Sequence, residues 1–247
     1  MPAIEVAGVS KAYGPRGNHV LALSDFNLQV QPGEFVCLVG ASGCGKSTLL
    51  ALLARLDRPQ GGRINTRGRV SLIFQDAALF PWLTAAENIR LALRLAGEPR
   101  RDWDNRVDEL LHLVHLDGFG GHRPHELSGG MRQRTALARA LAQRADILLM
   151  DEPFGALDAM TRDLLHDELE RLWLSTGATV LFVTHDVREA VRLGDRVVVL
   201  TSRPGRVADE VAIGLPRPRP VGDHRVGDFT ERITARLREE VMRHATE

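Results

Sequence analysis

The sequence predicts an α/β fold with a mainly parallel sheet flanked by helices, and three observations carry this prediction. Five short apolar runs, at residues 35–39, 70–74, 147–150, 179–184 and 196–200, are typical of strands buried on both faces. The segments between the runs repeat apolar residues at helical spacing. Four of the runs end at a glycine-rich loop or at polar residues, and such sheets bind ligands at the carboxyl ends of their strands.

Composition excludes several other classes of protein. The 247 residues include 44% hydrophobic residues, with 32 Lys+Arg against 32 Asp+Glu. Because there is no basic excess, we expect no nucleic-acid partner. No apolar run of about 18 residues is present to span a membrane, and the first residues do not resemble a signal peptide. With only two cysteines, a disulfide framework is not expected. We therefore expect a cytoplasmic protein.

The elements can be placed in chain order. The first 30 residues alternate enough to predict an N-terminal antiparallel β subdomain. Helices are expected at 46–56, from the capping box at Thr84 to near Gly97, around Val107 to Val114 and ended by Gly118, and at 161–173 ended by Gly177. Residues from about 76 to 145 contain no convincing strand, which predicts an α-helical subdomain inserted in the α/β core.

The C-terminal region has a different composition. A short strand is expected after residues 202–207, "SRPGRV", and the proline-rich segment 216–220 predicts an extended linker. Apolar residues spaced by four from Phe229 to Val241 predict a terminal helix. The expected division is thus residues 1–215 as the main domain and 216–247 as linker and C-terminal helix.

The glycine loop after the first apolar run fits a phosphate-binding pattern, Gly40-x-x-x-x-Gly45-Lys46-Ser47, between a strand and a helix. Backbone N–H groups in such a loop form a nest for phosphate oxygens. The lysine would reach the β- and γ-phosphates, and the serine hydroxyl would bind Mg²⁺. Cys44, among these amides and beside Lys46, is expected to form a stabilised, reactive thiolate. A nucleotide is expected here.

Two later segments indicate what is done to the nucleotide. Asp151, at the end of a buried strand, is placed to hold Mg²⁺, and Glu152 beside it is expected to act as the general base for an attacking water. Ser128 is a good N-cap followed by two glycines, which predicts a second phosphate-binding helix start. Two copies placed head to tail would each complete the other's site.

Taken together, the motifs "GASGCGKST", Gln75, "LSGGM", "ILLMDEP", "GALD" and "VTHD" resemble those of the ATP-binding cassette (ABC) ATPase family over residues 3 to 215. The resemblance implies a P-loop NTPase core that binds ATP and Mg²⁺. It also implies a dimer in which two cassettes clamp two ATP molecules and move separate membrane subunits. Met131 stands where the family often has glutamine, so that amide's contacts are missing.

The resemblance assigns roles to particular residues. Glu152, His185 and Gln75 are expected to be catalytic, with His185 and Gln75 near the γ-phosphate. Ser47, Gln75 and Asp151 are the expected metal ligands. Tyr13 would stack on adenine, and Asp158 would act across the dimer interface. The residues expected to bind the nucleotide are Tyr13, Gly40, Ala41, Ser42, Gly43, Cys44, Gly45, Lys46, Ser47, Thr48, Ser128, Gly129, Gly130 and Asp158.

The segment "FQDAALFPWLTAAENI" and the "SRPGRV" motif resemble the importer branch for nitrate, sulfonates and taurine. This implies a homodimer at the inner face of the membrane that serves permease subunits and, indirectly, a solute-binding protein. Phe80 and Trp82 are expected to contact the permease, with core packing of the helical subdomain as the alternative. A soluble ABC ATPase without transport and a P-loop kinase are the other functions considered. The solute itself cannot be predicted.

Overall fold

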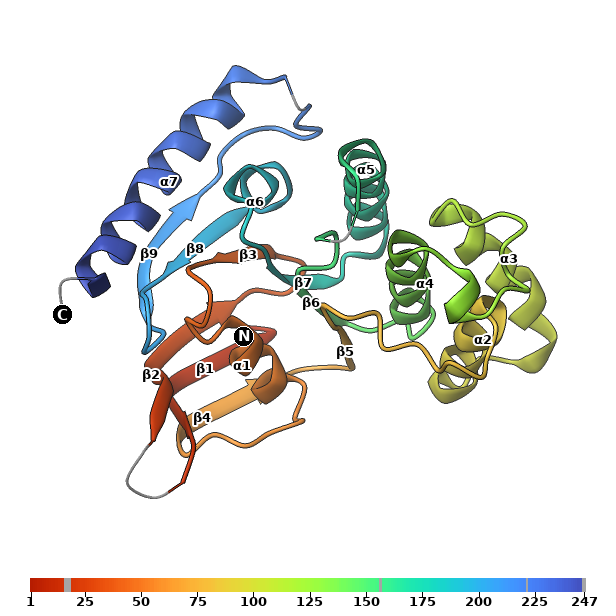
Figure 1. Cartoon of the computed structure of the whole chain (residues 1–247), viewed down its shortest axis with the longest axis horizontal. Helices are drawn as coiled ribbons and strands as arrows, with labels where there is room; N and C mark the ends of the chain where they lie inside the picture. Colours follow the sequence, from red (N-terminus) through yellow and green to blue (C-terminus); the bar gives the residue numbers. More distant parts are fainter. Residues whose placement is uncertain (16–18, 156, 221, 246–247) are drawn as a thin grey trace. The chain divides into compact units, whose positions relative to one another are not determined.

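The computed structural model describes the chain except residues 16–18, 156, 221 and 246–247, and the side chains of residues 244 and 245. By their internal contacts, the residues fall into two units. The first unit comprises residues 1–68 and 177–247, and the second comprises residues 69–176. Figure 1 labels the elements of both units.

The first unit contains a three-stranded antiparallel sheet in the order β2-β1-β4. Its strands are β1 (Ile4–Tyr13), β2 (Val20–Val30) and β4 (Gly61–Thr66). Ile4 on the central strand pairs with Val30 on one side and Thr66 on the other. The alternating pattern thus correctly predicted β1 and β2. Sequence analysis missed β4 because its sequence, GGRINT, has little apolar content.

The same unit contains strands β3 (Phe35–Val39), β7 (Thr179–Val183), β8 (Arg196–Leu200) and β9 (Val207–Ala212). Their order is β7-β3-β8-β9, parallel except for the antiparallel pair β8–β9. Every residue of β3 and β7 is buried, as the continuous apolar runs predicted. Leu38 pairs with Val183, and Val39 pairs with Val199. The carboxyl ends of β7, β3 and β8 therefore lie side by side.

Three helices belong to this unit: α1 (Lys46–Leu53), α6 (Val187–Leu193) and α7 (His224–Ala245). The α1 helix ends three residues earlier than expected. Arg55 adopts a left-handed backbone conformation, with φ of 58°, that no helix continues through. In Figure 1 the long α7 lies along β8, β9 and α6, the elements that it contacts.

The proline-rich segment, expected as an extended linker, is bound to the end of α6. The Arg219 side chain is only 3% exposed and donates hydrogen bonds to backbone carbonyls, including those of Val191 (2.7 Å) and Gly194 (2.6 Å). Arg217 donates to the Leu193 carbonyl and to Asp195. Composition does not predict that these arginines satisfy the last carbonyls of a helix. The domain division at residue 215 remains a prediction.

The second unit contains the parallel pair β5 (Val70–Ile73) and β6 (Ile147–Asp151), in which Ile73 lies opposite Met150. Its helices are α2 (Ala85–Ala96), α3 (Trp103–Leu113), α4 (Gly129–Leu141) and α5 (Ala159–Thr176), with 3₁₀ turns η1 (Arg100–Asp102) and η2 (Pro124–Glu126). Residues 76–145, all of them described, are helical or irregular and contain no strand.

The sequence correctly predicted both ends of α2, but not the end of α3. Thr84 and Glu87 form the expected capping box, and Gly97 ends α2 with φ of 80°. The expectation that Gly118 ends α3 was wrong, because α3 ends at Leu113 and His115 takes the left-handed conformation with φ of 53°. The helix therefore uses a histidine where glycine is commoner, so no glycine marks that end in the sequence.

Candidate functional site

The glycine loop between β3 and α1 folds around the Lys46 side chain. Lys46 is buried, and its ammonium donates hydrogen bonds to the carbonyl oxygens of Gly40 at 2.7 Å and Ala41 at 3.0 Å. The Cys44 N–H also points to the Ala41 oxygen, at 3.3 Å. These contacts define the inner side of the loop, where a lysine ammonium and a backbone amide converge.

A polyphosphate fits this loop. In the described part of the chain no carboxylate forms an ion pair with Lys46, and its positive charge is met by two carbonyl oxygens and the Cys44 sulfur. Gly45 has φ of 96°, and a Cβ there would lie 2.7 Å from the Ala22 carbonyl oxygen, so this position requires glycine. The helix that starts at Lys46 adds the positive end of its dipole. Ser47 and Thr48, on its first turn, are not buried.

The structure corrects the expected reactivity of Cys44. Its side chain is only 1% exposed, and burial raises the pKa of the thiol, although Lys46, with its ammonium 3.7 Å from the sulfur, acts in the opposite direction. Cys44 is thus a buried thiol and not the reactive thiolate expected. The sequence showed the neighbouring charge but not the burial that outweighs it.

His185 lies at the same edge of the sheet as the glycine loop. It follows β7, which pairs with β3, and the Thr184 N–H donates to the Leu38 carbonyl at 3.2 Å. The His185 side chain is exposed, and Asp186 beside it caps α6 by accepting from the N–H groups of Arg188 and Glu189. The first unit thus brings His185 and the loop together, as the strand ends predicted.

Tyr13, at the end of β1, has a half-exposed ring held by two charged side chains. Its hydroxyl donates to Asp57 at 3.1 Å, and Lys11 Nζ lies 5.1 Å from the ring centroid. Lys11 is itself buried and donates to Asp57 at 2.6 Å. This hydrogen bond is the main cause that lowers the pKa of Asp57. The sequence identified Tyr13 but not Lys11 and Asp57, which hold its ring in place.

In the second unit, β5 and β6 bring Gln75 and the acidic pair to one edge. Ile73 and Met150 are opposite each other, so Gln75, two residues after β5, and Asp151, the last residue of β6, lie at adjacent strand ends. Glu152 has a left-handed backbone with φ of 46°, which is uncommon for a residue with a side chain and is often found at functional sites. The Gly155 N–H donates to the Glu152 carbonyl at 3.2 Å.

Sequence analysis missed the residues that hold the segment around Gln75. The buried Gln133 of α4 donates to the Phe74 carbonyl at 3.2 Å, directly before Gln75. Arg139, two turns further along α4, donates to the carbonyls of Ala77 and Ala78. Gln133 and Arg139 are six residues apart, about 120° around the helix at ~3.6 residues per turn, so no shared helical face marks them in the sequence.

The second predicted phosphate-binding helix start is α4. Ser128 caps it by accepting from the Met131 N–H at 3.2 Å, and Gly129 and Gly130 occupy its first turn. Asp158 caps α5 by accepting from the Thr161 N–H at 3.0 Å, the main cause that lowers the pKa of Asp158. The remainder of "GALD" includes Ala156, which lies outside the described residues.

Phe80 and Trp82 form a contacting pair of exposed aromatic rings before α2. Their centroids are 5.4 Å apart, and Trp82 is 66% exposed. The buried Asn88 of α2 holds this segment, accepting from the Phe80 N–H at 2.9 Å and donating to the Thr84 carbonyl at 2.9 Å. Trp82 is therefore largely exposed and Phe80, 38% exposed, partly so, and the Asn88 side chain holds the backbone of this segment.

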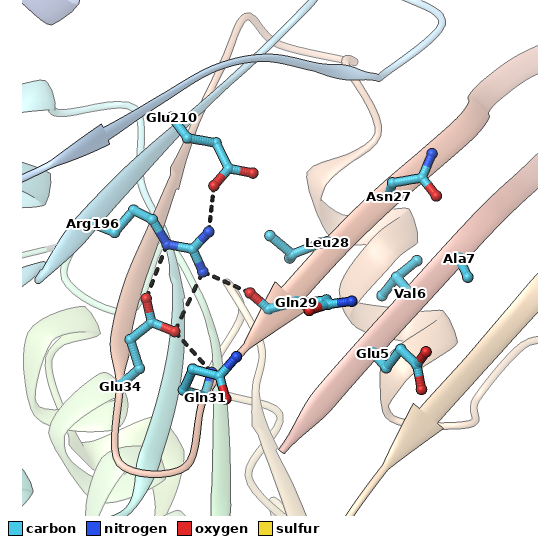
Figure 2. A pocket seen from close by; sticks show the side chains of 10 residues that line it. All are labelled: Glu5, Val6, Ala7, Asn27, Leu28, Gln29, Gln31, Glu34, Arg196 and Glu210. Carbon is cyan, nitrogen blue, oxygen red and sulfur yellow. Dashed lines mark hydrogen bonds and ion pairs between the residues drawn. The ribbon is translucent and has the colours of Figure 1, made fainter. Parts of the chain in front are cut away.

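The first unit also contains a pocket of about 480 Å³ whose lining includes none of the predicted site residues (Figure 2). Arg196 crosses it and donates to Glu34, to Glu210 and to the Gln29 carbonyl. Burial opposes the charge of this guanidinium, but its bonds to Glu34 and Glu210 outweigh burial and raise the pKa of Arg196. Because every charged group at the centre is paired, the cluster is best explained as a structural link between β2 and β8–β9.

The described residues contain neither a cluster of metal-binding side chains nor a helix that could span a membrane. Nowhere in that part of the chain do three or more His, Cys, Asp or Glu side chains gather as a metal site. A Mg²⁺ bound mainly by nucleotide phosphates needs only one or two protein ligands, and the metal ligands expected from the sequence, Ser47, Gln75 and Asp151, stay a prediction. Among the helices with described residues, none has the length and apolar content needed to span a membrane.

The profile of the ABC transporter family matches residues 23–155, more than half of the chain. The chain belongs to this family. A nitrate import ATP-binding protein of Synechocystis sp. is 44% identical over 221 residues, covering 86% of this chain and 83% of the relative. An aliphatic sulfonates import ATP-binding protein of Bacillus licheniformis is 46% identical, covering 85% and 84%. A taurine import ATP-binding protein of Roseobacter denitrificans is 44% identical, covering 79% and 76%.

Solved ABC cassettes are similar in structure. A dimeric ATP-binding cassette in a post-hydrolysis state, bound to ADP and Pi, has a TM-score of 0.79 and 33% identity. A dimeric bacterial ABC transporter cassette has a TM-score of 0.80 and 35% identity. Each comparison covers 86% of this chain and all of the solved one. The predicted fold class, the family, its nitrate, sulfonate and taurine branch, and the identity as an ABC ATPase are confirmed.

Proposed function

We propose that this ABC ATPase is the nucleotide-binding subunit of an importer for a small solute of the nitrate, sulfonate or taurine type. The observation that carries the nucleotide site is the buried Lys46 ammonium, which in the described residues bonds to the Gly40 and Ala41 carbonyl oxygens and the Cys44 sulfur and to no carboxylate. The relatives' names support import and the class of solute. Which solute is carried depends on a permease and a solute-binding protein, not on this chain.

In this proposal Lys46 and the loop amides bind the β- and γ-phosphates of ATP. Ser47, Asp151 and Gln75 hold Mg²⁺, which neutralises charge on the phosphate oxygens. Glu152 accepts a proton from the attacking water, and His185 and Gln75 orient the γ-phosphate and that water. The left-handed backbone of Glu152 supports this role, because such strain persists where a side chain must be aimed.

We further propose a homodimer in which the α4 start of one chain meets the glycine loop of the other across ATP. The capped N-terminus of α4, with two glycines in its first turn, presents backbone amides suited to a phosphate. The dimeric state of the similar cassettes supports this arrangement. Asp158, which sets the start of α5, lies in the segment proposed to cross the interface.

The permease contact is proposed at Phe80 and Trp82, at the inner face of the membrane. Two exposed rings on a segment fixed by Asn88 suit a docking site for a short permease helix. A soluble ABC ATPase without transport is the alternative function. Co-purification of the tagged chain with the permease encoded beside it would favour import, and its absence would favour the alternative.

The proposed chemistry is tested by Glu152→Gln. We expect ATP hydrolysis to fall about 10²–10⁴-fold, as for loss of a general base, while a fluorescent ATP analogue still binds. Glu109→Gln makes the same change on the exposed surface of α3, where Glu109 pairs with Arg106, and should leave hydrolysis unchanged. Hydrolysis by Glu152→Gln at the unmodified rate would contradict the assignment. Removing Mg²⁺ with EDTA should abolish activity in the unmodified protein.

A further inference from the structure

The turn between β8 and β9, residues 201–206, lies directly against the glycine loop. Gly205 shows how close the two are, because a Cβ there would lie 2.1 Å from the Cys44 carbonyl oxygen. Because β8 pairs with β3, the register places the turn next to the loop. The turn contains the first five residues of the "SRPGRV" motif, Ser202 to Arg206.

The turn is fixed independently of the glycine loop. The Gly205 N–H donates to the Ala22 carbonyl at 2.8 Å, and the Ser24 N–H donates to the Gly205 carbonyl at 3.2 Å. Inside the turn, the Thr201 hydroxyl donates to the Pro204 carbonyl at 2.8 Å. Ser202 donates to the Glu240 carbonyl of α7 at 3.4 Å. The turn is thus a rigid support anchored on β2 and α7.

Arg203 reaches from this support to the glycine loop. Its Nε–H donates to the Gly43 carbonyl oxygen at 3.3 Å, and a Cβ on Gly43 would lie 2.7 Å from the guanidinium. The C=O of one residue and the N–H of the next point in opposite directions across a trans peptide. Because Arg203 holds the Gly43 oxygen on its own side of the peptide, the Cys44 N–H points to the other side. There it donates to the Ala41 oxygen, which Lys46 also contacts.

We propose that Arg203 is a positioning residue for phosphate binding. By holding the 43–44 peptide from outside, it keeps one amide of the nest directed inward before the nucleotide arrives. Preorganised donors bind phosphate more tightly because no peptide rotation is needed on binding. The inference rests on the proposed nucleotide site at Lys46, and it gives the "SRPGRV" segment a function.

The test is calorimetric titration of the full chain with Mg-ADP and with inorganic tripolyphosphate. We expect Arg203→Ala to weaken both about three- to tenfold, the loss of one exposed charge-assisted hydrogen bond. Both ligands should be affected equally because the peptide faces phosphate and not the base. In steady-state hydrolysis of Mg-ATP, KM should rise by a similar factor with kcat unchanged. Arg203→Lys, which retains a cationic donor, should recover part of the affinity.

Arg206→Ala is the matched control. Arg206 is an exposed arginine of the same turn, but it donates to Ser24 at 2.9 Å and not to the glycine loop. It should bind both ligands like the unmodified protein. Equal weakening by Arg203→Ala and Arg206→Ala would indicate only a loss of nearby charge and overturn the proposal, as would unchanged binding by Arg203→Ala. Lys46→Ala tests the proposed nucleotide site separately from the role of Arg203. If Lys46→Ala binds both ligands like the unmodified protein, the assignment of the nucleotide site to this loop is wrong.

Discussion

The hydroxyl oxygen of Tyr13 lies 3.1 Å from a carboxylate oxygen of Asp57, which also accepts a hydrogen bond from the buried Lys11. Lys11 also lies over the Tyr13 ring, with its nitrogen 5.1 Å from the centroid. The Tyr13 ring is expected from the sequence to stack on adenine. Its orientation then depends on the Asp57 carboxylate, which makes no described contact with the glycine loop.

Asp57→Ala should therefore weaken ATP binding while leaving the phosphate-binding loop intact. We expect the Kd for ATP to rise roughly three- to tenfold, because the ring loses a side-chain hydrogen bond that orients it. Inorganic tripolyphosphate, which has no base, should bind unchanged. Tyr13→Ala should show the same selectivity. If Asp57→Ala weakened both ligands equally, the effect would be a general loss of structure and not of ring orientation.

The two cysteines should react slowly in the folded protein. Only a thiolate is alkylated, and burial raises the pKa of both Cys44 and Cys37. The reactive fraction at pH 7.5 is therefore smaller than for an ordinary thiol, and the rate should keep rising with pH to 9 and beyond. Mass spectrometry of iodoacetamide-treated protein would measure this. Labelling of Cys44 faster than in the urea-unfolded chain would restore the reactive thiolate that the sequence alone suggested.

Trp82→Ala should remove the permease contact without destabilising the protein. The ring is 66% exposed, so its loss leaves no cavity, whereas truncating an interface anchor commonly costs about 2 kcal/mol or more. We expect pull-down of the permease to fail while basal ATPase activity and melting temperature stay normal. Leu95→Ala on α2, where the side chain is 77% exposed, is the control and should change none of the three. Normal pull-down with a lowered melting temperature would favour core packing instead.

The sequence predicted elements where local chemistry decides the structure. Alternation and apolar runs identified β1 and β2 and the buried strands, and the Thr84 capping box placed the start of α2. It failed where the deciding partner is distant or unusual: His115 ends α3 instead of Gly118, and burial rather than Lys46 sets the pKa of Cys44.

The candidate site shows the same division. The types of residue that bind phosphate are visible as motifs, whereas their supports are not. Gln133, Asp57 and Arg203 act through backbone carbonyls or neighbouring side chains brought close only by folding. Such contacts leave no periodic signal in a single sequence.

The central claim is that two chains share each ATP, with Lys46 from one and the α4 start from the other. Light scattering of Glu152→Gln with saturating Mg-ATP tests it most directly, because slow hydrolysis should preserve the dimer. Adding Ser128→Arg places a bulky cation at the facing surface and should return the protein to a monomer that still binds ATP. Ser128→Ala is the matched control: it loses the same N-cap, worth about 1 kcal/mol, and the hydroxyl expected at the phosphate, but it leaves the surface open, so saturating Mg-ATP should still form the dimer. We expect a dimer for Glu152→Gln alone and with Ser128→Ala, and a monomer with Ser128→Arg. A dimer in all three would contradict the central claim.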